Sequence, residues 1–163
     1  MCPNGTYAAP GRRLESLNHC IPCKPGRYCV DGVINDQQLC DAGYFCKSGA
    51  SSPNDTKMLC PAGFFCDRGT TIPKKCLNGK FSKPGAVSQD NCTDCDLGYY
   101  CLDGSTKMNE CPRGHYCNSN ISPLPIPCPI GTFSNKTANA SIETCETCPP
   151  GTYCNDTAVI FPS

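Results

Sequence analysis

One short phrase occurs nine times along the 163 residues: Cys, two residues, Gly, one residue, then Tyr or Phe. Each copy supplies a glycine for a tight turn and a ring to cover it. So short a period cannot enclose the core of an enzyme domain, and it predicts small units that stack on their sequence neighbours. We number these repeats 1 to 9 from their first cysteines: Cys2, Cys23, Cys40, Cys60, Cys76, Cys95, Cys111, Cys128 and Cys148.

The chain is poor in large aliphatic residues and rich in cysteine. Leu, Ile, Val and Phe together number 26, whereas there are 18 cysteines and 16 prolines. Too little apolar surface is available to offset chain entropy, so disulfides must supply the difference. We therefore expect a small disulfide-rich fold with little regular secondary structure, made of short β-hairpins and turns in an elongated tandem-repeat rod.

Two kinds of repeat alternate. In long repeats 1, 5 and 8 the aromatic is followed by Ala or Ser and a long loop, whereas in short repeats the next residue is cysteine, as in CKPGRYC. The order predicts three blocks, residues 1–75, 76–127 and 128–163, each opening with a long repeat. We expect the chain to be a segment of a longer array.

Each repeat contains two cysteines, which favours disulfide pairing within the repeat. Bonds inside the Cys-x-x-Cys steps, or interlocked pairs between neighbouring short repeats, are the alternatives, and sequence alone leaves them open. Within-repeat pairing closes every cysteine: Cys2–Cys20, Cys23–Cys29, Cys40–Cys46, Cys60–Cys66, Cys76–Cys92, Cys95–Cys101, Cys111–Cys117, Cys128–Cys145 and Cys148–Cys154.

Turn residues follow the short repeats as well. A second glycine stands three residues after the closing cysteine, where we expect another left-handed turn. After Cys117 this place is taken by Asn120, the non-glycine residue that best tolerates such angles. The glycines concerned are Gly32, Gly49, Gly69 and Gly104.

Three repeats carry two adjacent aromatics. Most rings are expected to pack on their own disulfide and on the next repeat, as the only apolar material at hand. If side chains alternate along a strand, one ring of each doubled pair faces outward, free to stack on a sugar or another chain. The candidate contact aromatics are Tyr44, Phe64 and Tyr99.

Seven of the twelve asparagines stand in Asn-x-Ser/Thr sequons, a pattern typical of N-glycosylated proteins. Together with the disulfides it predicts a secreted protein, extracellular or at the cell surface, in an oxidising compartment. The expected glycosylation sites are Asn4, Asn54, Asn91, Asn120, Asn135, Asn139 and Asn155.

Other chemistry is disfavoured. Fourteen basic and fourteen acidic residues cancel without like-charge runs, so we expect no nucleic-acid partner, and the apolar runs are too short for a membrane span. The Cys-x-x-Cys steps lie too far apart for a zinc site, and His19 and His115 are expected to be exposed loop residues. Asp31–Gly32 and Asp103–Gly104 fit turns better than calcium sites. We expect no catalytic residue, metal or cofactor beyond covalent N-linked glycans.

The phrases CPNGTY, CPAGFFC and CPIGTFSNKTANASIETCETCPPGTYC resemble the cysteine-rich repeats of ephrin-type receptor tyrosine kinases and, more distantly, those of tumour necrosis factor receptors. Arrays of this kind also occur in secreted and surface proteins of protists and algae, including flagellar-hair (mastigoneme) proteins. The resemblance covers nearly the whole chain, and it implies a spacer, an adhesion rod or a ligand-binding stalk.

We therefore expect an extracellular, glycosylated structural repeat protein. It would form or decorate a filament, coat or flagellar hair by self-association or by contact with other extracellular glycoproteins. The alternative is the ligand-binding or adhesion stalk of a surface receptor or antigen. A protease-inhibitor or toxin-like role would need a protruding stapled loop, for which residues 8–19 are the candidate.

Overall fold

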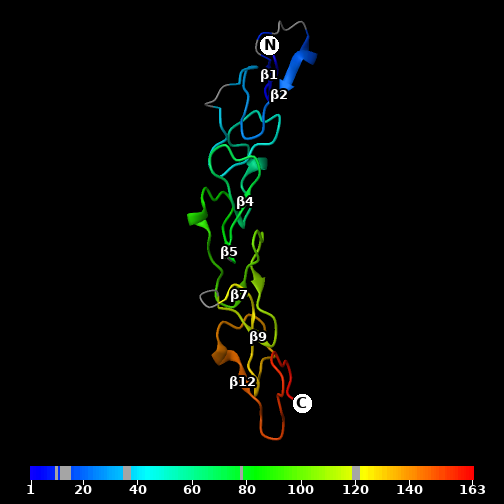
Figure 1. Ribbon diagram of the computed structural model, residues 1–163, viewed down its shortest axis with the longest axis vertical. Coiled ribbons are helices and arrows are strands. Elements are labelled where there is room, and N and C mark those ends of the chain that lie inside the picture. The colour runs from blue at the N-terminus through cyan, green and yellow to red at the C-terminus, as the bar shows by residue number, and fades with distance from the viewer. Residues whose placement is uncertain (10, 12–15, 35–37, 78, 119–121) are drawn as a thin grey trace. The chain divides into compact units, whose positions relative to one another are not determined.

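The computed structural model describes residues 1–9, 11, 16–34, 38–77, 79–118 and 122–163 (Figure 1). Within these ranges the chain forms only short hairpins, turns and single turns of 3-10 helix. No α-helix occurs among the described residues. No helical segment in these ranges is therefore long and apolar enough to cross a membrane. The small disulfide-rich fold of hairpins and turns expected from the composition is confirmed.

Six antiparallel two-stranded sheets form in the described residues, each within one repeat. They pair β1 (Thr6–Ala8) with β2 (Cys20–Pro22), β3 (Phe64–Phe65) with β4 (Lys74–Lys75), β5 (Lys80–Phe81) with β6 (Thr93–Asp94), β7 (Tyr99–Tyr100) with β8 (Asn109–Glu110), β9 (His115–Tyr116) with β10 (Ile126–Pro127), and β11 (Thr132–Phe133) with β12 (Glu146–Thr147). The 3-10 turns are η1 (Leu17–His19), η2 (Thr56–Met58), η3 (Gln89–Asn91) and η4 (Ile142–Thr144).

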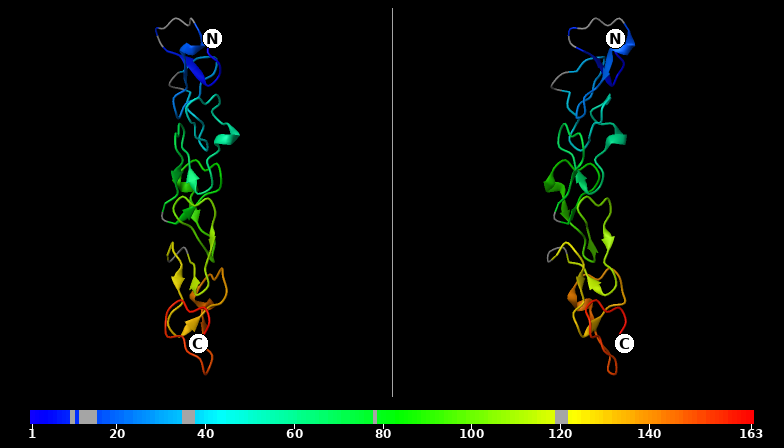
Figure 2. Two further views of the ribbon diagram at one scale, coloured as in Figure 1. Left: turned by 90° about the vertical axis from the view of Figure 1, so that its right-hand side faces the viewer. Right: turned by 45° about the vertical axis from the view of Figure 1, so that its right-hand side comes forward.

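The chain divides into two compact units. The first comprises Met1–Lys75 and Ser82–Cys92, and the second comprises Cys76–Phe81 and Thr93–Ser163. Within each unit the colour changes gradually from one repeat to the next, so neighbours in the sequence are neighbours in space (Figures 1 and 2). Each unit is thus a stack of repeats, without a layered core.

The disulfides staple individual repeats. Nine bonds use all 18 cysteines, and no cysteine is free. Cys76 and Cys92 are both disulfide-bonded. The other eight bonds coincide with the within-repeat pairs expected above: Cys2–Cys20, Cys23–Cys29, Cys40–Cys46, Cys60–Cys66, Cys95–Cys101, Cys111–Cys117, Cys128–Cys145 and Cys148–Cys154.

Sulfur forms most of the buried core. Fifteen of the 18 cysteines are buried, whereas Tyr7 and Tyr116 are the only repeat aromatics among the buried described residues. The Tyr7 side chain packs with Cys23 and Cys29. This ring therefore covers the disulfide of the following repeat, so its burial couples one repeat to the next.

All fifteen glycines adopt positive φ angles, from 68° to 88°. They include the turn expected at Gly32, Gly49, Gly69 and Gly104, while Asn120 lies outside the described residues. In repeats 8 and 9 the second turn uses alanine instead, at Ala138 (φ 56°) and Ala158 (φ 58°).

In six repeats the first-turn glycine is held by the next repeat through both of its backbone groups. The N–H of Gly26 donates to the carbonyl of Cys46 (2.9 Å), and its own carbonyl accepts from the N–H of Cys40 (3.1 Å). The positive φ angle gives the peptide groups this direction. The same pair of bonds recurs at Gly5, Gly43, Gly98, Gly114 and Gly131.

A second pair of backbone bonds joins the same neighbours. Between repeats 3 and 4 the N–H of Cys46 donates to the carbonyl of Thr70 (3.0 Å), and the N–H of Gly69 donates to the carbonyl of Cys40 (2.9 Å). Equivalent bonds join repeats 2 and 3, 4 and 5, 7 and 8, and 8 and 9. Where all four bonds form, the hydrogen bonds of the interface are made by main-chain groups.

The first-turn glycines also lie against the repeat after next. A Cβ atom added at Gly26 would come within 2.5 Å of the Gly69 carbonyl oxygen, and one at Gly98 within 2.3 Å of the Ala138 oxygen. Distances this short do not occur between real atoms, so stacking requires glycine for its size as well as for its φ angle.

The contribution of stacking can be separated from that of backbone strain with two glycine variants. Gly151 has a φ of 88° but nothing within 4 Å of an added Cβ, so Gly151→Ala should lose only about 1–2 kcal/mol from left-handed strain. Gly26→Ala adds the collision with Gly69 and should be clearly more destabilising. Thermal unfolding under non-reducing conditions measures both, and equal losses would contradict the close approach.

The left-handed alanines predict a stabilising substitution. Ala138→Gly should raise the stability by about 1 kcal/mol, because glycine relieves the strain at φ 56°. Ala86→Gly is the matched control: Ala86 does not have a positive φ angle, so glycine there should destabilise by about 0.4–1 kcal/mol through backbone entropy. Denaturant titration should give opposite signs, and a destabilised Ala138→Gly would argue against the assigned turn.

Candidate functional site

The candidate functional surface consists of the sequon asparagines and the doubled-aromatic hairpins. Asn4, Asn54, Asn91, Asn135 and Asn155 are exposed, each on a turn or loop, or at the end of a 3-10 turn. Asn120 lies outside the described residues. Five sequons therefore present their side chains on the outside of the repeats.

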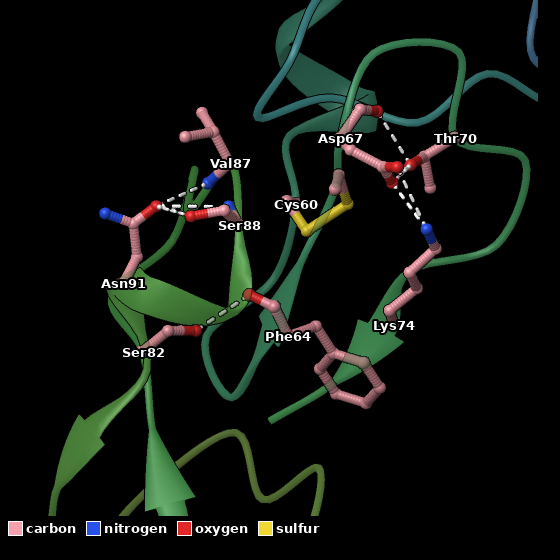
Figure 3. The surroundings of a disulfide bond; sticks show 10 residues. Cys60, Phe64, Asp67, Thr70, Lys74, Ser82, Val87, Ser88 and Asn91 are labelled. Carbon is pink, nitrogen blue, oxygen red and sulfur yellow. Dashed lines mark hydrogen bonds and ion pairs between the residues drawn. A yellow bond between two sulfur atoms is a disulfide. The ribbon is translucent and has the colours of Figure 1, made fainter. Parts of the chain in front are cut away.

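Asn91 shows how the fold leaves the attachment atom accessible. Its Oδ1 accepts hydrogen bonds from the N–H groups of Val87 (3.0 Å) and Ser88 (3.1 Å) at the start of η3. Figure 3 shows its Nδ2 atom pointing away from these partners. A glycan on Nδ2 is compatible with the cap, because only the amide oxygen is used.

Asn139 is placed differently, and the glycan expected there is incompatible with the folded chain. Only 5% of the residue is exposed. Its Nδ2 atom, which would carry the sugar, donates to the carbonyls of His115 and Lys136 (both 3.0 Å) and to Ser134 Oγ (2.8 Å). Asn139 is therefore a structural residue that ties the loop of repeat 8 to repeat 7.

The doubled aromatics do not divide into one outer and one inner ring. Tyr44, Phe64 and Tyr99 are half-buried, and so are the rings that follow them in the sequence. The alternation expected from the sequence is therefore absent at the level of exposure. Both rings of each pair are covered in part and accessible in part.

Phe64 lies at a junction between repeats. Its carbonyl accepts a hydrogen bond from the hydroxyl of Ser82 (2.7 Å), a residue only 1% exposed. Figure 3 shows the phenyl ring turned away from the Cys60–Cys66 disulfide. The backbone of Phe64 thus joins repeats 4 and 5, while its ring points away from the disulfide.

Repeat 4 also carries an ordered polar cluster on its second turn. Lys74 Nζ lies 2.8 Å from Asp67 Oδ1 and 5.9 Å from the centre of the Phe65 ring. The hydrogen bonds from Lys74 and then from Thr70 Oγ1 hold the pKa of Asp67 below its ordinary value. Both ends of the ion pair are more than half exposed, so its contribution to stability is small.

The aspartates weighed as calcium ligands take part in turn contacts, Asp31 through its backbone and Asp103 through its carboxylate. The Asp31 N–H donates to Asn4 Oδ1 (3.1 Å), and Asp103 Oδ1 accepts from the N–H of Gly79 (3.1 Å). His19 lies in η1 and His115 in β9, and both are half-buried, so the expectation that they are exposed loop residues is wrong. Over the described ranges no group of three or more His, Cys, Asp or Glu side chains converges.

Shallow hollows lie beside the second turns. One of about 120 Å³ is lined by residues that include Ser48, Ala50 and Asp55 in repeat 3, and one of about 180 Å³ lies among Asp67, Thr70 and Lys74 in repeat 4. Each hollow lies beside the second turn of its repeat, and no motif in the sequence indicates it.

A scan against protein-family models and a search of curated proteins both found no match to this chain. The resemblance to ephrin-receptor-type repeats therefore stays a prediction carried by the residues quoted above.

Glycan mapping of the protein from its source cell tests the placement of the sequons. We expect sugars on Asn4, Asn54, Asn91, Asn135 and Asn155 and none on Asn139, whose Nδ2 atom is buried and bonded three times. Peptide mass spectrometry after enzymatic deglycosylation distinguishes occupied from free asparagine. A glycan on Asn139 in folded protein would contradict the described loop.

The structural role of Asn139 has its own test. Asn139→Ala removes three hydrogen bonds of a buried amide and should destabilise by about 2–3 kcal/mol. Asn135→Ala, at an exposed sequon in the same loop, should change the stability by less than about 0.5 kcal/mol. Similar losses in unglycosylated protein would show that burial of Asn139 carries no energetic weight.

Proposed function

We propose that this chain is a secreted, glycosylated structural protein whose repeats build or decorate a filament, coat or flagellar hair by self-association. The observation that carries the proposal is the interface between repeats, since its hydrogen bonds are made by main chain and recur along the chain. A repeat that extends itself through main chain suits a mechanical element, and its outer residues are free to serve contacts and glycans.

The cysteine usage supports an extracellular location. All 18 cysteines are in disulfides, a state that persists in oxidising compartments. The five exposed sequons suit the same location and would add solubility and resistance to proteases. On this proposal the role is non-enzymatic, and the partners are further copies of the chain or other extracellular glycoproteins.

The second candidate function is a binding stalk of a surface receptor or antigen. It is favoured by the distribution of the sequons, because repeats 2, 4 and 6 contain none. Repeats 4 and 6 also hold partly accessible doubled aromatics. A ligand could dock on such sugar-free repeats, and the resemblance to receptor repeats fits this role equally.

Electron microscopy of native, unreduced material from the source cell tests the two candidates. The structural role predicts filaments or coats with a regular axial repeat, and reduction should dissolve them because the repeats lose their staples. Mildly alkylated but unreduced material serves as the control. Isolated particles of one or two chains at all concentrations would contradict the structural role and favour the stalk.

A further inference from the structure

Two hairpins of the chain carry the same arrangement with opposite charge. In β3–β4 Phe64 lies directly across from Lys75, and in β7–β8 Tyr99 lies directly across from Glu110. Directly opposed residues share one face of a hairpin. Repeat 4 therefore presents an aromatic ring beside a lysine, and repeat 6 presents an aromatic ring beside a glutamate.

The charges of these two hairpins are exposed and unused. Lys75 and Glu110 are both exposed, and neither takes part in an ion pair among the described residues. Neighbouring Lys74 is different, because it is bound to Asp67 and lies over Phe65. The cation opposite Phe64 and the anion opposite Tyr99 are thus available to a partner.

Repeat 5 shows what the same positions do when the charge is satisfied internally. There the two opposed residues are Lys80 and Asp94, which form an ion pair of 3.0 Å within the hairpin. In repeat 6 Tyr99 replaces the lysine, and Glu110 keeps the acidic position without a partner in the hairpin. In repeat 4 Phe64 replaces the lysine, and Lys75 replaces the acid. One hairpin therefore presents an anion beside a ring, and the other presents a cation.

The surroundings favour contact at these repeats. Neither contains a sequon, whereas repeats 3, 5 and 7 each contain one. The first compact unit carries ten Lys and Arg against seven Asp and Glu, and the second carries four against seven. Their formal net charges are therefore +3 and −3, which adds long-range attraction between the first unit of one copy and the second unit of another.

We propose that the Phe64–Lys75 face of one chain binds the Tyr99–Glu110 face of a second copy. Lys75 pairs with Glu110 across the contact, and the two rings pack together beside the pair, partly desolvating it. This inference rests on the proposed self-association and names the surface that carries it. Because the two faces differ, the contact is heterologous and can propagate from copy to copy.

Charge reversal and charge exchange test the contact on the full, disulfide-bonded, glycosylated chain. Sedimentation and electron microscopy would compare wild type with Lys75→Glu, Glu110→Lys and the double variant carrying both. Each single reversal places like charges together and should weaken association about 10-fold or more, and the double exchange should restore it. Lys57→Glu in η2 and Glu143→Lys in η4 are matched exposed controls that change the unit charges equally and should weaken association far less.

The outcomes separate the contact from the proposed function. Filaments that persist in both single variants, or a double exchange that stays dissociated, would overturn the contact without touching the structural role. If the charge variants dissociate dimers but wild type never forms longer assemblies, the contact would be supported and the proposed filament would be contradicted. Unchanged amide hydrogen exchange in each variant establishes that the repeats remain folded, and Tyr99→Ser supplies a second, uncharged variant that should weaken association.

Discussion

The structure depends on the capture of one glycine peptide by the next repeat. The N–H of a first-turn glycine reaches the carbonyl that ends the next repeat's disulfide loop, and its carbonyl reaches the N–H that begins it. Only a left-handed turn aims the groups this way, and only a missing Cβ allows the carbonyl of the repeat beyond to approach. Where the next repeat is short, its disulfide joins the residues that supply this acceptor and this donor, so cysteine and glycine together encode these hydrogen bonds.

The separate roles of cysteine and glycine explain why the disulfide pairs and the turns can be predicted from the sequence. Two cysteines per repeat leave little freedom of pairing, and a glycine at constant distance from cysteine signals a turn. In the long repeats the second cysteine comes later in the sequence, and another residue follows the aromatic. Ser82 takes its place in repeat 5, where its carbonyl accepts from Gly63 (2.9 Å) and its hydroxyl bonds to Phe64. A small polar residue that can bury its hydroxyl is sufficient there.

Other features escape sequence reasoning because they depend on the partner repeat. Ala138 and Ala158 occupy left-handed turns that alanine does not signal. Asn139 matches a sequon, yet its amide is consumed by groups from repeats 7 and 8. Alternation along a strand failed for the doubled aromatics because strands of two residues have no continuous inner face, so both rings are partly covered.

An interface built from main chain leaves the exterior as the place where repeats differ in function. On the proposed role, glycans at the sequons would keep copies apart at those repeats, whereas two sequon-free repeats present charged aromatic hairpins. A chain of zero net charge with oppositely charged units has little general repulsion to keep copies apart. Association then depends on where bare, complementary faces lie, and a heterologous contact between two different repeats of the same chain lengthens without closing unless its geometry returns to the start.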